Sequence, residues 1–109
     1  MTQIALTEAV YYILLSLTKV RHGYGIMQDV EELSGGRVHL AAGTLYGALT
    51  ALLTKGWIAA LPGERDSRKK EYTITAEGRE VLQAELVRLK ELCANGEKIL
   101  GGNDENGHS

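Results

Sequence analysis

The stretch AAGTLYGALTALLTKGWI, from Ala41 to Ile58, decides the fold, because it predicts a helix that stops at Gly56 and runs directly into a strand. The segment carries no charge before Lys55. One side of this helix is apolar and consists of Leu45, Ala48, Leu49, Leu52 and Leu53. The opposite side is small and neutral and consists of Gly43, Gly47, Thr50 and Thr54, flanked by Thr44, Tyr46 and Ala51.

An outer face of this kind has a cost, since each interior glycine destabilises a helix by about 1 kcal/mol relative to alanine. Close approach to another surface is one reason to accept that cost. A DNA major groove admits a helix, and threonine methyl and hydroxyl groups can meet thymine methyls, base edges or phosphate oxygens. The alternative is a plain solvent-facing helix, and this segment alone does not decide between the two.

The neighbouring segments predict the rest of the fold. A first helix runs from an N-cap at Thr7 to Lys19, a second spans residues 24–33, and RVHL at 37–40 is a short extended link or single strand. WIAALPG at 57–63 and KKEYTIT at 69–75 are two short strands. A long helix follows, with Thr75 as its N-cap. Three helices, a β-hairpin and a last helix are the plan of a winged helix-turn-helix.

The predicted fold class is therefore mainly α with a small β-hairpin, a winged helix-turn-helix plus a C-terminal dimerisation helix. We expect a DNA-binding domain at 1–75, a dimerisation helix at 76–100 and a disordered tail at 101–109.

Positive charge is concentrated in the middle of the chain, although the formal net charge is −2. The loop between the two strands, GERDSRKKEY, carries Arg65, Arg68, Lys69 and Lys70 against three acidic residues. A basic hairpin tip beside a neutral helix fits a wing that contacts phosphates. A solvated, charged turn is the commoner meaning of such a run.

Three motifs together resemble the PadR family of bacterial transcriptional regulators: HGYGI at 22–26, GTLYGALTALLTKGWI at 43–58 and RKKEYTITAEG at 68–78. The resemblance covers residues 6–89. Because the chain is short and has one C-terminal helix, it is similar to the small subfamily of that family. It implies a homodimeric DNA-binding protein, usually a repressor, in which the GTLY helix reads DNA. It also implies that Leu45, Leu49, Leu52, Trp57, Ile58, Tyr72 and Ile74 form the core.

Residue by residue, the motifs and the basic loop give a candidate DNA-binding set. Many relatives carry Arg or Lys near the positions of Thr50 and Ala51, where this chain has neither, so base readout is expected to rest on Thr, Tyr and DNA shape. The candidate DNA-binding residues are Tyr24, Gly43, Thr44, Tyr46, Gly47, Thr50, Thr54, Lys55, Arg65, Arg68, Lys69 and Lys70.

A homodimer is predicted from the terminal helices. Leu82, Leu86, Leu89 and Cys93 recur at heptad spacing, which indicates either a seam with a partner helix or packing on the chain's own core. The first helix is apolar almost all round between Val10 and Leu17, so it is expected to pack outside the monomer as well. The candidate interface residues are Val10, Tyr11, Leu14, Leu82, Leu86, Leu89 and Cys93.

The expected partners are a double-stranded DNA operator of pseudo-palindromic sequence and a second copy of the chain. A small hydrophobic or phenolic effector is a further candidate, because family members sense such molecules near the dimer interface. The alternative function is a protein-interaction or ligand-binding module on the same fold with weak or no DNA binding. The uncharged helix face and the negative net charge favour that alternative.

Enzymatic and metal chemistry find no support in the sequence. His22, His39, His108 and Cys93 are too scattered for a metal site, no paired catalytic groups stand out, and no cofactor is expected. One cysteine excludes an intrachain disulfide. The N-terminus lacks signal-peptide features and the longest apolar run is too short for a bilayer, so a cytoplasmic protein without a membrane span is expected.

Overall fold

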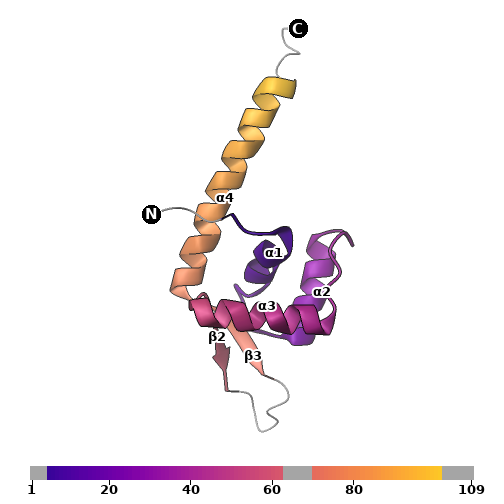
Figure 1. The fold of residues 1–109 in the computed structure, drawn as a ribbon, viewed down its shortest axis with the longest axis vertical. Helices are drawn as coiled ribbons and strands as arrows, with labels where there is room; N and C mark the ends of the chain where they lie inside the picture. Colours follow the sequence, from indigo (N-terminus) through magenta and orange to yellow (C-terminus); the bar gives the residue numbers. More distant parts are fainter. Residues whose placement is uncertain (1–4, 63–69, 102–109) are drawn as a thin grey trace.

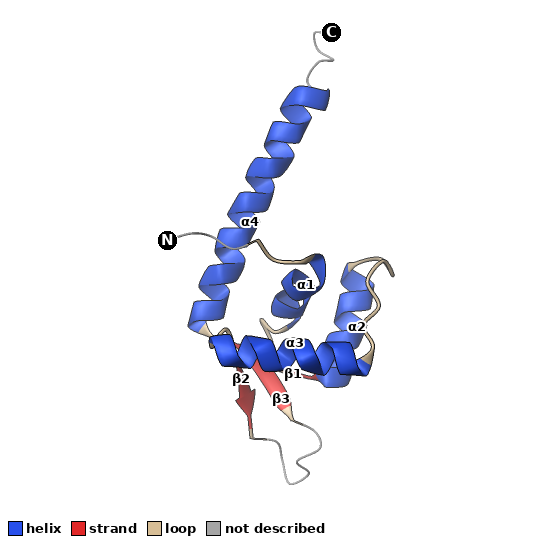
Figure 2. Ribbon diagram, in the orientation of Figure 1, coloured by secondary structure: helices blue, strands red, loops and turns tan. Residues whose placement is uncertain are grey.

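The computed structural model describes residues 5–62 and 70–101. Four helices and three short strands follow one another within this part of the chain (Figure 2). The order is α1 (Glu8–Ser16), β1 (Arg21–His22), α2 (Gly23–Leu33), α3 (Ala42–Lys55), β2 (Ile58–Leu61), β3 (Glu71–Ile74) and α4 (Ala76–Gly96), which continues as the π-helical turn η1 (Glu97–Gly101). This architecture confirms the predicted winged-helix fold, mainly α with a small β-hairpin.

Two threonine caps fix where helices begin, as the sequence predicts. The Thr7 hydroxyl oxygen accepts a hydrogen bond from the Val10 N–H at 3.1 Å, and Thr75 accepts one from the Gly78 N–H at 3.0 Å. Thr75 also donates its own proton to the Gly56 carbonyl at 2.7 Å. Because Gly56 has the left-handed conformation, with φ of +79°, it ends α3 and turns the chain into β2.

One predicted boundary is wrong, because helix α1 ends at Ser16 instead of Lys19. Of the two alternatives for residues 37–40, the described chain has the link and not the strand. Besides the two predicted strands the sheet contains β1, which lies just before α2. It pairs antiparallel with β3, with Arg21 opposite Tyr72. The sheet order is β1-β3-β2. A two-residue strand has no alternation to detect, so only its tertiary pairing reveals it.

The core lies where α1, α2, α3 and the sheet meet, with α1 in the centre. Ile13 and Leu14 of α1 are fully buried, and the flanking Val10, Tyr11, Tyr12 and Leu15 are partly buried against the same cluster. Six of the seven predicted core residues are buried, and Trp57 is half-buried. Leu53, which the helical wheel places on the apolar side of α3, is instead 37% exposed.

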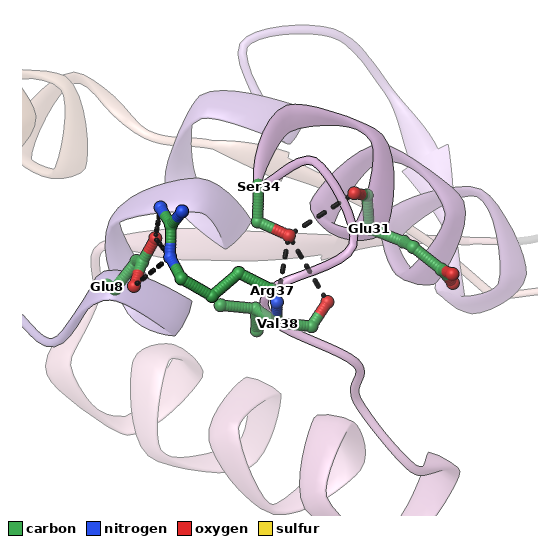
Figure 3. A network of polar contacts seen from close by, with 5 residues as sticks. All are labelled: Glu8, Glu31, Ser34, Arg37 and Val38. Atoms are coloured by element: carbon green, nitrogen blue, oxygen red, sulfur yellow. Dashed lines mark hydrogen bonds and ion pairs between the residues drawn. The ribbon is translucent and has the colours of Figure 1, made fainter.

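A polar network ties the connection between α2 and α3 to the start of α1 (Figure 3). Ser34 accepts a hydrogen bond from the Val38 N–H at 2.9 Å, and its own hydroxyl donates to the Glu31 carbonyl at 3.2 Å. Arg37 forms an ion pair with Glu8, the first residue of α1. The loop that precedes α3 is therefore held from both sides, which fixes where α3 begins.

Helix α4 leaves the body of the molecule and projects away from it, so that the chain measures 63 × 33 × 20 Å (Figure 1). Glu85 links α4 to the N-terminal segment of the chain. Its carboxylate is 1% exposed, accepts the Leu6 N–H at 3.2 Å and binds Arg88 through two hydrogen bonds of 2.8 and 2.6 Å. Within the described residues, no helix combines the length and apolarity that a bilayer crossing requires.

Candidate nucleic-acid interface

The outward face of α3 is as small and neutral as the sequence predicts. Gly43, Gly47, Thr50 and Thr54 are all exposed. A Cβ atom added to Gly43 or Gly47 would meet nothing within 4 Å. The packing of the described chain therefore does not require glycine at either position. We call this surface the neutral face.

The threonines on the neutral face use their hydroxyl protons within the helix. Thr50 donates to the Tyr46 carbonyl at 2.9 Å, and Thr54 donates to the Thr50 carbonyl at 3.0 Å. What they still offer to another molecule is a methyl group and the lone pairs of the hydroxyl oxygen. Such a surface suits apolar contact with thymine methyls better than donation to base acceptors.

Two tyrosines extend this surface toward the N-terminus of α2. Tyr24 is 65% exposed and Tyr46 is 47% exposed. The Tyr46 ring lies against Gly23, where an added Cβ would come 2.9 Å from its Cζ atom and overlap its hydroxyl. Gly23 therefore leaves the space in which the Tyr46 hydroxyl sits beside the first turn of α2. Burial raises the pKa of Tyr72, and the nearby Tyr46 raises it further.

The helix N-termini divide into two kinds. Thr7 and Thr75 cap α1 and α4 with their side chains, whereas His22 and Ala41 give α2 and α3 no side-chain cap. The first N–H groups of a helix carry partial positive charge and are good anion donors when nothing caps them. The two helices without a side-chain cap are those that carry the candidate DNA-binding residues.

Positive charge near the neutral face is sparse in the described chain. Lys55 lies on the flank of α3, with its Nζ atom 5.3 Å from the centroid of the Trp57 ring. Lys70 is exposed and directly precedes β3. The other predicted wing residues, Arg65, Arg68 and Lys69, lie outside the described residues.

The sequence did not predict one cluster of polar side chains that positions the elements. Arg21 of β1 binds Asp29 of α2 through two hydrogen bonds of 3.0 and 3.1 Å, and Ser16 of α1 donates to the same carboxylate at 2.7 Å. Because Arg21 pairs with Tyr72, this cluster ties the sheet to α1 and α2. No local pattern in the sequence indicates this long-range pairing.

The predicted dimer residues fall into two groups. Leu14 and Leu82 have 0% and 7% of their surface exposed, so they belong to the core of the single chain and offer almost nothing to a partner. Val10, Tyr11 and Leu89 are half-buried, and Leu86 and Cys93 are exposed. Beyond Leu89, Leu92 of α4 is 52% exposed, and Ile99 and Leu100 of η1 are 69% and 81% exposed.

Solved structures with the same fold include transcriptional regulators. A PadR family regulator from Eggerthella lenta matches with a TM-score of 0.70 and 27% identity, over 86% of this chain and 82% of its own. RosR from H. salinarum matches with a TM-score of 0.61 and 29% identity, over 88% and 79%. A PadR family regulator from Clostridium difficile shares the fold at a TM-score of 0.69 and 24% identity, over 86% and 98%.

Comparison of the sequence with family models also identifies transcriptional regulators. No curated protein matches. The model of the transcriptional regulator PadR-like family matches residues 11–84, from the fourth residue of α1 through α2, α3 and the sheet to the first half of α4. The matched region contains the neutral face and both helices without a side-chain cap. This is a family of transcriptional regulators, not an enzyme class, and membership implies regulation through DNA. The chain belongs to the PadR-like family of transcriptional regulators.

Proposed function

We propose that this protein is a cytoplasmic, homodimeric repressor that binds a pseudo-palindromic operator and is released by a small hydrophobic or phenolic ligand. Residues 1–75 act as the DNA-binding domain and residues 76–100 as the dimerisation helix. Helix α3 enters the major groove with its neutral face, and the basic loop between β2 and β3 contacts phosphates.

The observation that carries the proposal is the combination of the neutral face with the two N-termini that lack a side-chain cap. Gly43 and Gly47 have no packing role in the described chain, yet they cost helix stability. They are explained if a second surface approaches α3 closely. The first turns of α2 and α3 add N–H groups that suit phosphate oxygens, and Tyr46 lies beside the first of them.

The dimer is supported by the surface of α4. Leu89, Leu92, Gly96 and Ile99 follow one another at spacings of three and four, so they share one helix face. Leu82 is 7% exposed, whereas Leu92 and Ile99 are 52% and 69% exposed. The C-terminal half of α4 projects away from the body of the molecule (Figure 1). A second copy would cover the exposed leucines and present two α3 helices about one DNA turn apart.

Binding to DNA is tested with a labelled duplex from the chain's own upstream region, by fluorescence anisotropy at several salt concentrations. We expect saturable binding, a steep loss of affinity with salt and much weaker binding to a scrambled duplex. Neutralising Arg65, Arg68, Lys69 and Lys70 to glutamine should lower the salt slope by about one for each phosphate that the variant no longer neutralises.

The neutral face is tested with Gly47→Glu, which adds a strong helix former at an open position and places a carboxylate against the DNA. We expect it to remove specific binding while the protein stays folded. Gln83→Glu is the matched control, because it adds the same charge at an exposed position of α4. Equal effects of the two variants would mean that net charge, and not the neutral face, governs binding.

A second candidate function is a protein-interaction module with weak DNA binding. It is favoured by the scarcity of charge on α3, whose single cation lies on Trp57, and by the net charge of −2. Weak binding without sequence preference, in a protein shown to be folded and dimeric, would support this candidate and overturn the repressor.

A further inference from the structure

Helix α4 is attached to the body of the protein along one narrow face. Within the described chain its buried residues are Gly78, Leu82 and Glu85, which share one side of the helix. The first two meet the body through backbone and apolar surface, and the third meets it through a carboxylate. Glu85 is therefore the last buried residue of α4 before the helix projects away from the body (Figure 1).

The Glu85 carboxylate is held from two directions. The Leu6 N–H, from the N-terminal segment, donates to its Oε2 atom at 3.2 Å. Arg88, one turn further along α4, donates to both carboxylate oxygens at 2.8 and 2.6 Å. Hydrogen bonds to a charged carboxylate are short and directional. Because the Glu85 side chain is also 1% exposed, this contact fixes the orientation of the helix more closely than apolar packing alone would.

Stability alone does not account for a carboxylate at this position. Glu85 lies between Leu82 and Leu89 on the apolar side of α4, where leucine would bury apolar surface with no charge to desolvate. Apolar residues of similar volume often replace a buried ion pair without loss of stability. The geometry that the ion pair specifies explains the presence of Glu85 better than the free energy that it contributes.

The same contact leads to the loop that positions α3. Leu6 is partly buried against the core and is followed by Thr7, the N-cap of α1. Glu8, the next residue, forms the ion pair with Arg37 in the loop that precedes α3. A continuous set of contacts therefore joins the middle of α4 to the N-terminal end of α3.

We propose that Glu85 is a positioning residue that sets the angle of α4 on the body, and thereby the distance between the two α3 helices of a dimer. It thus selects the half-site spacing that an operator must have. The inference rests on the proposed function, in which α4 forms the dimer and α3 enters the groove.

Small changes of this angle matter on DNA. Gly96 lies 11 residues beyond Glu85, which makes this part of α4 a lever of about 16 Å. A tilt of about 10° moves the end of the lever by ~3 Å relative to the body, and two-fold symmetry doubles the change between protomers to ~6 Å. Base pairs are stacked about 3.4 Å apart, so the change corresponds to one or two base pairs of spacing.

The distance is measured without DNA by double electron–electron resonance, with one spin label per protomer on α3. The label is attached at Thr54→Cys, an exposed position, after Cys93→Ser removes the only natural cysteine. Sedimentation velocity verifies that the labelled proteins are dimers. We expect one narrow distance while Glu85 is present. Glu85→Gln keeps the size but loses the charge and one acceptor oxygen, and should shift or broaden the distance by about 3 Å or more.

Two further variants make the measurement specific. Glu91→Gln is the matched control, because it makes the same chemical change at an exposed position of α4 and should leave the distance unchanged. Arg88→Lys keeps the ion pair but loses the planar fork that binds both carboxylate oxygens, so it should give a smaller effect of the same kind. It also tests the proposal if Glu85→Gln folds poorly.

Operator duplexes with the half-sites moved together or apart by one or two base pairs test the selection of spacing. The unchanged protein should favour one spacing, and Glu85→Gln should reduce that preference about fivefold. A purely structural role would lower stability in urea and weaken binding to every duplex by the same factor. An intact preference of that kind would overturn the proposal.

An unchanged distance in a dimeric Glu85→Gln protein would also overturn the proposal while leaving the dimer in place. An unchanged protein that sediments as a monomer would instead overturn the proposed dimer, and the positioning role with it. Because the distance is measured without DNA, it decides the role of Glu85 even where operator binding fails.

Discussion

At the residue scale, Gly78 shows how a single position without a side chain holds two elements together. It stands in the first turn of α4, where the helix passes the backbone of Trp57. A Cβ atom there would overlap the Trp57 carbonyl oxygen and lie 2.9 Å from Cγ1 of Ile74. Neither neighbour can move easily, because Thr75 donates its N–H to the same Trp57 carbonyl at 3.0 Å and Ile74 is buried.

Gly78→Ala should therefore destabilise the protein, by about 1–3 kcal/mol, as overpacking of a filled site does. Urea unfolding monitored by circular dichroism measures the difference. Gly43→Ala is the control in this DNA-free measurement, since nothing lies within 4 Å of an added Cβ at that exposed helical position. A Gly78→Ala variant as stable as the unchanged protein would show that α4 shifts freely on β3.

The pair of Glu8 and Arg37 gives the chain a contribution to stability that depends on pH. The hydrogen bond from Arg37 is the main cause that lowers the pKa of Glu8 below its ordinary value of 4.5, so the folded state favours the charged carboxylate. Stability from such a group is fully present above the unfolded pKa and is lost as the pH falls through the lower folded pKa.

Arg37→Gln should thus be less stable than the unchanged protein near neutral pH, and the difference should shrink as the solution is acidified below pH 4.5. Urea unfolding across that range measures it. The effect is expected to be small, since both side chains are well exposed. Arg79→Gln should show no such pH dependence, and a constant deficit for Arg37→Gln would mean that the arginine acts through packing instead.

At the scale of elements, the glycines of the neutral face lower the stability of α3 but allow the close approach to DNA that we propose. Gly47 lies within α3 with open space around it, so Gly47→Ala should raise the free energy of unfolding by about 1 kcal/mol. If α3 sits deep in a groove, the same change should weaken operator binding. Thermal unfolding and anisotropy on the same samples measure both. A variant that gains stability and keeps full affinity would place Gly47 away from the DNA surface.

The elements themselves were largely predictable, because their ends are marked by residues with one strong local role. Thr7, Thr75 and Gly56 stand where the predicted boundaries fall. The neutral face followed from helical spacing alone. Strand β1 and the Arg21–Asp29–Ser16 cluster were missed, since each forms only through contacts between distant elements.

At the scale of the whole molecule, tertiary contacts and not the local pattern separate Leu82 from Leu92. Both lie on α4 and both suit an apolar seam, but a heptad pattern does not say which copy of the chain covers each position. The three-dimensional course of α4 decides it. Leu82 faces the chain's own core, whereas Leu92 lies beyond the body and is 52% exposed. Of the predicted seam, Leu82 packs in the core of the chain, whereas Leu86 and Cys93 are exposed, as is Leu92 beside them.

Leu92→Glu should break the proposed dimer, because a carboxylate would be buried against apolar side chains of the partner. The single chain gives it no reason to unfold, since Leu92 already faces solvent there. Sedimentation velocity should show a shift from dimer to monomer, and specific operator binding should fall with it, since one protomer contacts only half of a pseudo-palindromic site.

Ala94→Glu is the matched control, because it adds the same charge two residues away on the opposite side of α4 and should leave both the dimer and the DNA affinity intact. The comparison also separates two ways of failing. A Leu92→Glu protein that remains dimeric would place the interface elsewhere, and the exposed stripe of α4 would then need another partner. A monomer that still binds the operator with full affinity would mean that recognition needs only one α3 helix, and the predicted two-fold arrangement on DNA would be wrong.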